Sequence, residues 1–413
     1  MKLSGLRLHR WRLLRCALAG LVVFSILASY IYLSVRPSYA LYDRLHRSEV
    51  ESANRFLHDS ANDQAKFVVF RQLQGAGFNN QAQEILLFHH LALTSNRTYV
   101  YQPLVWRPRG EKATVPLSAF LYGVTDSSVP FAGFEDACPP ESISHIRLRT
   151  KGVTHAALWT RALALLQSPA RCIVVDDWIL NWSYLASSAI PAIWPSFSQY
   201  LSSQFAWSPR ILEISNRTYH TLNLRPNHLD IPGDRYLAVH FRRGDFEDHC
   251  RILSERQTGF TTWAVLPELQ SAILSPPLDT ANGSSVMEHC YPSIERVIAA
   301  IKMQTERHPL TTAVHVLHDG AWDHPTVYYL THRLGSELKA QSLGWVGSPI
   351  ARVTHSGQVP LQWGEADWAV AVDLEIARRA DGFIGNGYSS FSTQAIALRL
   401  GADSGKLTDI SIY

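Results

Sequence analysis

The chain has 413 residues and a formal net charge of +3 at pH 7, and 46% of its residues are hydrophobic. This length is more than one hydrophobic core usually holds, and it predicts two folded domains. Residues 1–36 contain six of the 38 Lys and Arg residues and none of the 35 Asp and Glu residues, so the rest of the chain carries a net charge of −3. Because that remainder has no basic tract, the composition argues against nucleic acid as a partner.

The N-terminus combines a basic segment with an apolar one. Residues 16–35 form an uncharged run of 20 residues, which is long enough to span a bilayer as a helix. The positive-inside rule places the basic residues before this run in the cytosol and the rest of the chain in a lumen. A cleaved signal peptide is the alternative, but the run is long for one and residues 28–30 fit a cleavage site poorly. We expect a cytosolic tail over residues 1–15, a transmembrane signal anchor over residues 16–35 and a stem over residues 36–64, helical around residues 42–57.

Four cysteines follow the apolar run, and an even number in an oxidising lumen predicts two disulfides. Of the three possible connectivities we expect the pairs that are neighbours in sequence and domain, Cys138–Cys172 and Cys250–Cys290. A zinc site is the less favoured alternative, because no Cys-x-x-Cys spacing occurs. Four sequons for N-glycosylation fit exposure to a lumen. They lie at Asn96, Asn181, Asn216 and Asn282.

The globular part begins with a predicted βαβ unit. Residues 66–70 form an apolar strand, residues 85–93 a periodic helix and residues 98–101 a second strand. The glycine loop between the first strand and the helix lets a ligand approach the backbone, and three amide side chains follow it. A plain tight turn is the alternative, since the loop lacks the spacing of a P-loop or a dinucleotide fingerprint. The three amides are Asn79, Asn80 and Gln81.

The remainder of the first half continues the alternation. Residues 104–145 are rich in Pro and Gly and predict an irregular excursion, followed by a helix over residues 155–167 and a strand over residues 171–175. The strand ends in Asp176 and Asp177. Adjacent acids point to different faces, so we favour capping of the following turn over metal binding.

The second half repeats the pattern after a Pro- and Asn-rich stretch over residues 220–234. This stretch predicts a boundary between a domain over residues 65–225 and a second over residues 226–413. Strands alternate with helices in both halves, which indicates two Rossmann-like α/β domains facing a cleft. In the second domain we expect strands over residues 236–241 and 313–317, a polar loop to about residue 262, and helices over residues 293–307, 326–338 and 367–379.

The strand over residues 236–241 leads into a cluster of charged side chains. In open α/β sheets, ligands bind outside the carboxyl ends of strands, and His240, Arg242 and Asp245 gather at this end. The planar fork of donors of Arg242 suits phosphate oxygens, so the segment indicates an anionic ligand. The alternative is a surface loop in which Arg243 pairs with Asp245.

A Gly/Ser segment near the C-terminus provides a second anion-binding signal. Residues 380–400 predict a short strand, a turn containing Gly385 and Gly387, and a helix that begins among serines. Backbone N–H groups and the positive end of the helix dipole then meet at one point, which suits phosphate. Ordinary capping by serine is the alternative reading.

Three segments together resemble the GDP-fucose-dependent protein O-fucosyltransferases. They are Gly75-Ala-Gly-Phe-Asn-Asn-Gln81, His240-Phe-Arg-Arg-Gly-Asp245, and Asp373-Leu-Glu-Ile with Phe383-Ile-Gly-Asn-Gly-Tyr-Ser-Ser-Phe391. Their order is similar to the family's, and the resemblance covers most of residues 65–400. It implies a GT-B fold with an acceptor-side N-terminal domain and a GDP-sugar-side C-terminal domain. It also implies a single-pass type II membrane protein of the Golgi or endoplasmic reticulum with a lumenal catalytic part.

The resemblance also implies roles for individual residues. Arg242 would hold the β-phosphate of GDP and stabilise it as it leaves, and His240 would contact the nucleotide. Asp373 would accept hydrogen bonds from the guanine or its neighbourhood. Asn80, beside Asn79, would reach the diphosphate and sugar from the facing domain. The phosphates and the base would be seated by Ser389, Ser390 and Phe391. No cofactor or metal is expected, because this family looks metal-independent and the chain lacks Asp-x-Asp.

One departure concerns the proton of the acceptor. Some family members carry Glu in the glycine loop as a candidate base, whereas Ala76 stands at the matching place here. Asp245 is then the nearest candidate for a catalytic carboxylate. The leading hypothesis is an inverting transferase that moves fucose from GDP-fucose to Ser or Thr hydroxyls of a protein. The alternatives are a glycan-directed fucosyltransferase and a catalytically silent GDP-sugar-binding homologue. A membrane-tethered structural or adhesion protein is disfavoured, because the sequence shows no repeats or extended stalk.

Overall fold

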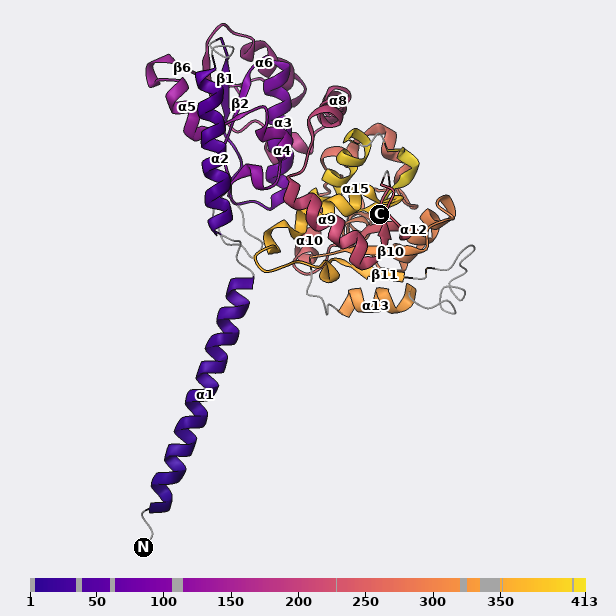
Figure 1. Cartoon of the computed structure of the whole chain (residues 1–413). Helices are drawn as coiled ribbons and strands as arrows, with labels where there is room; N and C mark the ends of the chain where they lie inside the picture. Colours follow the sequence, from indigo (N-terminus) through magenta and orange to yellow (C-terminus); the bar gives the residue numbers. More distant parts are fainter. Residues whose placement is uncertain are drawn as a thin grey trace.

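The computed structural model describes residues 4–34, 39–59, 64–105, 114–227, 229–319, 325–334, 350, 352–402 and 405–413 of the chain. Two parallel sheets, one from each half of the sequence, form the centre of the folded body, and helices cover them (Figure 1). The N-terminal helix projects from this body. An α/β protein with parallel sheets is therefore confirmed.

The projecting helix is α1 (Ser4–Ser34). Within the described residues, its segment Leu14–Tyr32 is the one stretch that is long and apolar enough to cross a membrane, and the rest of the protein does not bury it. Signal sequences and membrane anchors share this length and composition. The transmembrane assignment over residues 16–35 and the Golgi or endoplasmic-reticulum location therefore stay predictions.

The predicted stem contains α2 (Tyr39–His58), so the expected helix is confirmed. This helix packs on the globular body, because Tyr42 and Ala53 are buried there. The Tyr42 hydroxyl also donates a hydrogen bond to the Asp367 carboxylate, 325 residues later, at 2.9 Å. This part of the predicted stem thus belongs to the globular fold.

The first sheet has the strand order β5-β2-β1-β7-β6, and its pairings are parallel. The predicted βαβ unit is confirmed, and the Phe70 ring of the central strand stacks on Phe88 of the crossover helix at 4.5 Å. The strands are β1 (Phe67–Phe70), β2 (Thr98–Tyr101), β5 (Val129–Pro130), β6 (Ile143–Ile146) and β7 (Cys172–Val175). Beside them lie α3 (Phe78–Thr94), α4 (Tyr122–Thr125), α5 (Phe131–Ala137), α6 (His155–Leu166) and the antiparallel pair β3 (Leu104–Val105) and β4 (Thr114–Val115).

The second sheet has the strand order β11-β10-β9-β12-β13, and its pairings are also parallel. Its middle strand is buried and lies between two partners, so three carboxyl ends meet at one edge of the sheet. The strands are β8 (Leu224–Arg225), β9 (Asp234–His240), β10 (Ala313–Leu317), β11 (Arg352–His355), β12 (Gly382–Gly385) and β13 (Ile410–Ile412). The helices of this half are α10 (Phe246–Glu255), α11 (Gly283–Cys290), α12 (Ile294–Arg307), α13 (Pro325–Leu334), α15 (Ala369–Arg379) and α16 (Ser390–Ala397).

Helices near the chain midpoint connect the two halves. They are α7 (Trp182–Leu185), α8 (Trp194–Gln204) and α9 (Pro209–Leu222). α9 packs on α15, and β8 pairs with β9, so elements just before residue 226 already pack with the second sheet. The division at residues 225 and 226 stays a prediction.

Two local expectations for the second half need correction or restriction. The polar loop expected up to residue 262 contains α10, an amphipathic helix whose Phe246 and Cys250 face the interior. The helix expected over residues 326–338 corresponds to α13, and residues 335–338 lie outside the described residues. Sequence reasoning also missed β11 and β13, because β11 is not a run of buried apolar residues and β13 has only three residues.

Both predicted disulfides are present. Cys138–Cys172 joins the end of α5 to β7, and Cys250–Cys290 joins α10 to α11. Of the sequons, Asn96, Asn216 and Asn282 are exposed. Asn181 is half-buried and caps α7, because its side-chain oxygen accepts the Tyr184 N–H at 3.1 Å. Occupancy of the four sequons stays a prediction.

Replacing Cys250 and Cys290 together by serine should lower the free energy of unfolding by about 2–5 kcal/mol, because a cross-link between distant residues restricts the unfolded chain. The two cysteines are 40 residues apart in sequence. Thermal unfolding followed by circular dichroism under non-reducing conditions measures this change. Cys16→Ser, at the unpaired cysteine of α1, is the control and should change stability by less than about 0.5 kcal/mol. Equal stability of the double variant and the parent would contradict the prediction.

Candidate functional site

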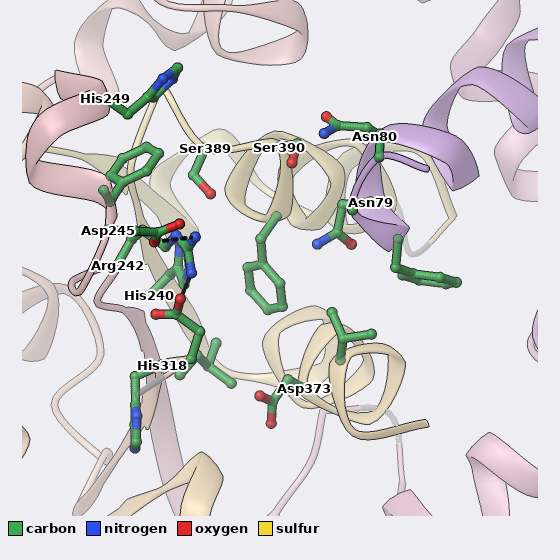
Figure 2. Close-up of a pocket in the computed structure, with 18 of the residues that line it drawn as sticks. Asn79, Asn80, His240, Arg242, Asp245, His249, His318, Asp373, Ser389 and Ser390 are labelled. Carbon is green, nitrogen blue, oxygen red and sulfur yellow. Dashed lines mark hydrogen bonds and ion pairs between the residues drawn. The ribbon is translucent and has the colours of Figure 1, made fainter. Parts of the chain in front are cut away.

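A cavity of about 1030 Å³ lies between elements of the two halves. Its walls come from the start of α3, the carboxyl ends of β9 and β10, one side of α15 and the start of α16 (Figure 2). Every substrate-binding or catalytic residue predicted from the sequence lines this pocket. These residues are Asn79, Asn80, His240, Arg242, Asp245, Asp373, Ser389, Ser390 and Phe391.

The glycine loop forms one wall and is held by its own backbone and by Gln81. Gly75 has a φ of 74°, which glycine adopts without strain, and its N–H donates to the Val105 carbonyl at 2.9 Å. The Gln81 amide donates to the Ala76 carbonyl at 2.7 Å and also bonds Val105. Gln81 is fully buried and does not line the pocket, so its amide holds the loop.

Asn79 and Asn80 lie in the first turn of α3 and face the pocket from the first half of the chain (Figure 2). The side-chain oxygen of Asn79 is buried and has no hydrogen-bond partner among the described residues. A buried amide oxygen without a partner is costly. The Asn79 oxygen is therefore available to accept a hydrogen bond from a ligand in the pocket.

Arg242 forms the opposite wall, two residues after His240. Its guanidinium makes ion pairs with Asp245, at 3.0 Å, and with Asp319 at the end of β10. Asp319 was not among the predicted site residues. The neighbouring strands β9 and β10 are parallel, and His240 lies opposite Leu317. Arg242 and Asp319 each follow two residues later, so this register brings their side chains together.

Arg243 points the other way, because successive residues of an extended chain alternate in direction. It is buried between the rings of Phe241 and Tyr291, at 4.0 and 4.1 Å from their centroids, and it donates to the carbonyl of Pro292. The alternative of an Arg243–Asp245 surface pair is therefore wrong. Arg243 thus fixes the strand end in the core, and Arg242 faces the pocket.

His240 is almost fully buried and forms part of the pocket floor. Its Nδ1 lies 2.8 Å from the Ser392 hydroxyl, and its ring packs against Phe391 with centroids 4.5 Å apart. Burial lowers the pKa of the imidazole to about 3, and the nearby Arg242 and His318 add to this effect. The ring is therefore neutral at physiological pH.

The Gly/Ser loop between β12 and α16 is fixed by Asn386. Its side chain donates to the Cys290 carbonyl at 2.6 Å and accepts the Tyr388 N–H at 2.9 Å. A Cβ at Gly387 would lie 2.4 Å from the Phe260 ring, so this glycine is required by close packing. The loop places Ser389 and Ser390 at the helix start, where backbone N–H groups have no partner within the helix.

Asp373 projects from α15 into the pocket wall and is largely buried (Figure 2). Desolvation raises its pKa to about 7, and a hydrogen bond with Ser356 partly opposes this shift. One carboxylate oxygen has no hydrogen-bond partner among the described residues. The group can therefore accept a hydrogen bond from a ligand when it is ionised.

The paired acids at the end of β7 bind groups in and after the neighbouring strand β6. Asp177 accepts N–H groups of Leu148 and Arg149 at 2.9 and 2.6 Å, and Asp176 contacts His145 at 2.8 Å. The expected capping of the following turn is therefore wrong, because Asp177 holds the segment that follows β6. Among the described residues, no group of three or more His, Cys, Asp or Glu side chains could hold a metal ion.

Several pocket residues were not predicted from the sequence. Trp182, Phe246, His249 and Tyr388 line the wall together with His318 and Asp319. The two residues after β10 could have been found, because the carboxyl ends of adjacent parallel strands share an edge. Trp182, Phe246 and His249 lie on helices that carried no motif, whereas Tyr388 lies within the Gly/Ser motif, where its side chain had been given no role.

The protein thus has two parallel sheets and a pocket at the carboxyl ends of their strands. This edge is the place where α/β proteins of this class bind ligands. No protein-family model matches this sequence, and no curated protein matches it. Among solved structures, the chain is similar to POFUT1 in complex with GDP-fucose, with a TM-score of 0.51 and 14% identity over 86% of this chain and 99% of that chain. It is equally similar to POFUT1 in complex with GDP, with a TM-score of 0.51 and 14% identity over 85% and 99% of the two chains. At this identity the likeness shows the fold, so the resemblance to the O-fucosyltransferases is confirmed at the level of the fold.

Asp373→Asn should stabilise the protein at pH 8 relative to the parent and much less at pH 5. The folded protein binds the proton of Asp373 more tightly than the unfolded chain, since the pKa rises from 3.8 to about 7. Its contribution to the free energy of unfolding therefore falls as pH rises through this window, by up to about 4 kcal/mol.

Urea unfolding of both proteins at pH 5 and pH 8 measures the difference. Gln199→Ala, at an exposed and uncharged side chain of α8, is the control and should leave the pH dependence of stability as in the parent. A stability difference between Asp373→Asn and the parent that is the same at both pH values would show that Asp373 does not titrate in this range.

Proposed function

We propose that this chain is an inverting, metal-independent fucosyltransferase of GT-B architecture that moves fucose from GDP-fucose to a Ser or Thr hydroxyl of a protein. One observation carries the proposal. Nine residues chosen from three separate motifs lie around a single cavity of about 1030 Å³, and they come from both halves of the chain. The similar structures are POFUT1 complexes with GDP-fucose and GDP, which supports the choice of donor.

The pocket offers the groups that a nucleoside diphosphate sugar needs. Arg242 and the start of α16 would bind the diphosphate, one with a guanidinium and the other with backbone N–H groups. The carboxylate of Asp373 would accept hydrogen bonds from guanine, which carries N–H donors on one edge. Asn79 and Asn80 would reach the sugar and the diphosphate from the opposite wall.

In the reaction, the acceptor oxygen attacks C1 of the fucose while the bond from C1 to the β-phosphate oxygen breaks. The bonding electrons leave with GDP, and negative charge develops on the diphosphate. Arg242 is placed to stabilise that charge, which is worth about 100- to 1000-fold in rate at comparable sites. Phosphate oxygens would compete with Asp245 and Asp319 for this guanidinium.

The proton of the acceptor hydroxyl has no acceptor in the glycine loop, since Ala76 carries no acid. Asp245 is the pocket carboxylate expected to accept this proton. Its side chain is 84% exposed and is bonded to Arg242. This contact supports a second role for Asp245, in orienting Arg242. The reaction would then proceed through an oxocarbenium-like sugar that needs little help from a base, and the hydroxyl proton would pass to water.

A catalytically silent homologue is the second candidate. Ala76 favours the silent homologue. A protein that only binds GDP-fucose needs the diphosphate site but does not need an acid in the glycine loop. A glycan acceptor would use the same donor site.

We also propose that α1 anchors the chain as a type II membrane protein of the Golgi or endoplasmic reticulum with the pocket in the lumen.

The donor site is tested by calorimetric titration of the full chain in detergent with GDP and with UDP, both in the presence of EDTA. GDP should bind and UDP should not, because Asp373 complements the N–H donors of guanine. Arg242→Ala should lose GDP binding. Absence of binding by either nucleotide would leave a shared fold without a shared donor.

Transfer itself is tested with Arg242→Lys and radiolabelled GDP-fucose. Lysine keeps the charge but cannot bind two phosphate oxygens at once, so turnover should fall by about 100-fold or more. Near-normal turnover of this variant would contradict the role of Arg242. GDP binding by the parent without transfer to protein or glycan acceptors would favour the silent homologue.

A further inference from the structure

The buried Nδ1 edge of His240 contacts Ser392, a residue that was not among the predicted site residues. Ser392 lies in the first turn of α16 and is fully buried, and its hydroxyl oxygen is 2.8 Å from His240 Nδ1. The same oxygen accepts the backbone N–H of Asn386 at 2.8 Å. Ser392 thus lies between the end of β9 and the loop that carries Ser389 and Ser390.

These two contacts determine the direction of the hydrogen bond to the histidine. A serine hydroxyl has one proton to donate, and its lone pairs accept. The Asn386 N–H occupies a lone pair, and the described residues offer the hydroxyl proton no acceptor other than His240 Nδ1. The opposite arrangement, with Nδ1–H donating to Ser392, would leave a buried hydroxyl proton without a partner, which is unfavourable.

The proton of the neutral ring then resides on Nε2. This nitrogen has no hydrogen-bond partner among the described residues, and the ring lines the pocket two residues before Arg242 (Figure 2). Packing against Phe391 limits rotation of the ring. The low pKa of the buried imidazole keeps it neutral, so the donor is present across the physiological pH range.

We propose that Ser392 is a positioning residue that fixes the Nε2–H tautomer of His240, so that the ring presents a constant neutral donor to an oxygen of a nucleoside diphosphate. This inference rests on the proposed function for the identity of the ligand. The state of the ring itself depends only on the contacts within the protein.

A pair of amide substitutions separates the two nitrogens of the ring. The amide nitrogen of Gln can occupy the position of Nε2, whereas that of Asn reaches only the position of Nδ1. In calorimetric titrations of the full chain with GDP, His240→Asn should bind about 10- to 100-fold more weakly than the parent, which is the range for a lost hydrogen bond to a charged group. His240→Gln should retain most of the affinity.

The matched control is the same pair at His315, a fully buried histidine of the neighbouring strand β10 whose Nδ1 bonds the Thr354 hydroxyl at 2.8 Å. His315 does not line the pocket. Both His315 variants should bind GDP within about twofold of the parent. Equal loss in His240→Gln and His240→Asn, with the His315 pair unchanged, would overturn the assignment of the donor to Nε2.

The tautomer is read directly by solid-state NMR of the full chain labelled with ¹⁵N-histidine, with the His240 signals assigned by their absence in His240→Gln. We expect a protonated Nε2 and an unprotonated Nδ1 in the parent and in Ser392→Thr, which keeps the hydroxyl. Ser392→Ala should show a mixture of tautomers and weaker GDP binding. A protonated Nδ1 in the parent overturns the proposal even if GDP binds, whereas the expected tautomer without GDP binding would refute the proposed function alone.

Discussion

The site depends on the parallel pairing of β9 with β10 on one side and β12 on the other. His240 lies opposite Leu317, and Ile384 lies opposite Val239, so the three strands end at the same level. Arg242, Asp319 and the Gly/Ser loop follow these ends directly. A shift of one residue in either pairing would exchange the faces of the strand and turn Arg242 towards the core in place of Arg243.

Buried contacts with the backbone then hold each segment that leaves the sheet. Arg243 is fixed between two aromatic rings, Asn386 bonds the carbonyl of Cys290, and Ser392 joins His240 to the loop. The Cys250–Cys290 disulfide ties α10 to α11 beside this loop. The groups that face the pocket are thus supported by a second set of side chains with satisfied hydrogen bonds, which is the arrangement that keeps a polar site rigid.

The first half of the chain completes the pocket from the other side. The start of α3 projects Asn79 and Asn80 towards the wall formed by Arg242, and Gln81 holds the loop before them (Figure 2). The connection between the halves is extensive, since Trp207 donates to Glu375 of α15 at 3.0 Å and Tyr42 of α2 bonds Asp367. The Phe78 ring at the start of α3 packs on Trp207 with centroids 6.4 Å apart, so this contact links the position of α3 to that of α15, which carries Asp373.

The sequence by itself determined the α/β class, the central strands of both sheets, both disulfides and nine of the residues that line the pocket. These follow from local patterns: runs of apolar residues mark buried strands, and glycine with serine marks turns and helix starts. Only the tertiary structure decided that Arg243 and Gln81 are structural, that Asp319 joins Arg242, and that Ser392 contacts His240. The physical reason is that each of these roles depends on which distant segment lies within hydrogen-bonding distance, and the packing of the sheets and helices sets that distance.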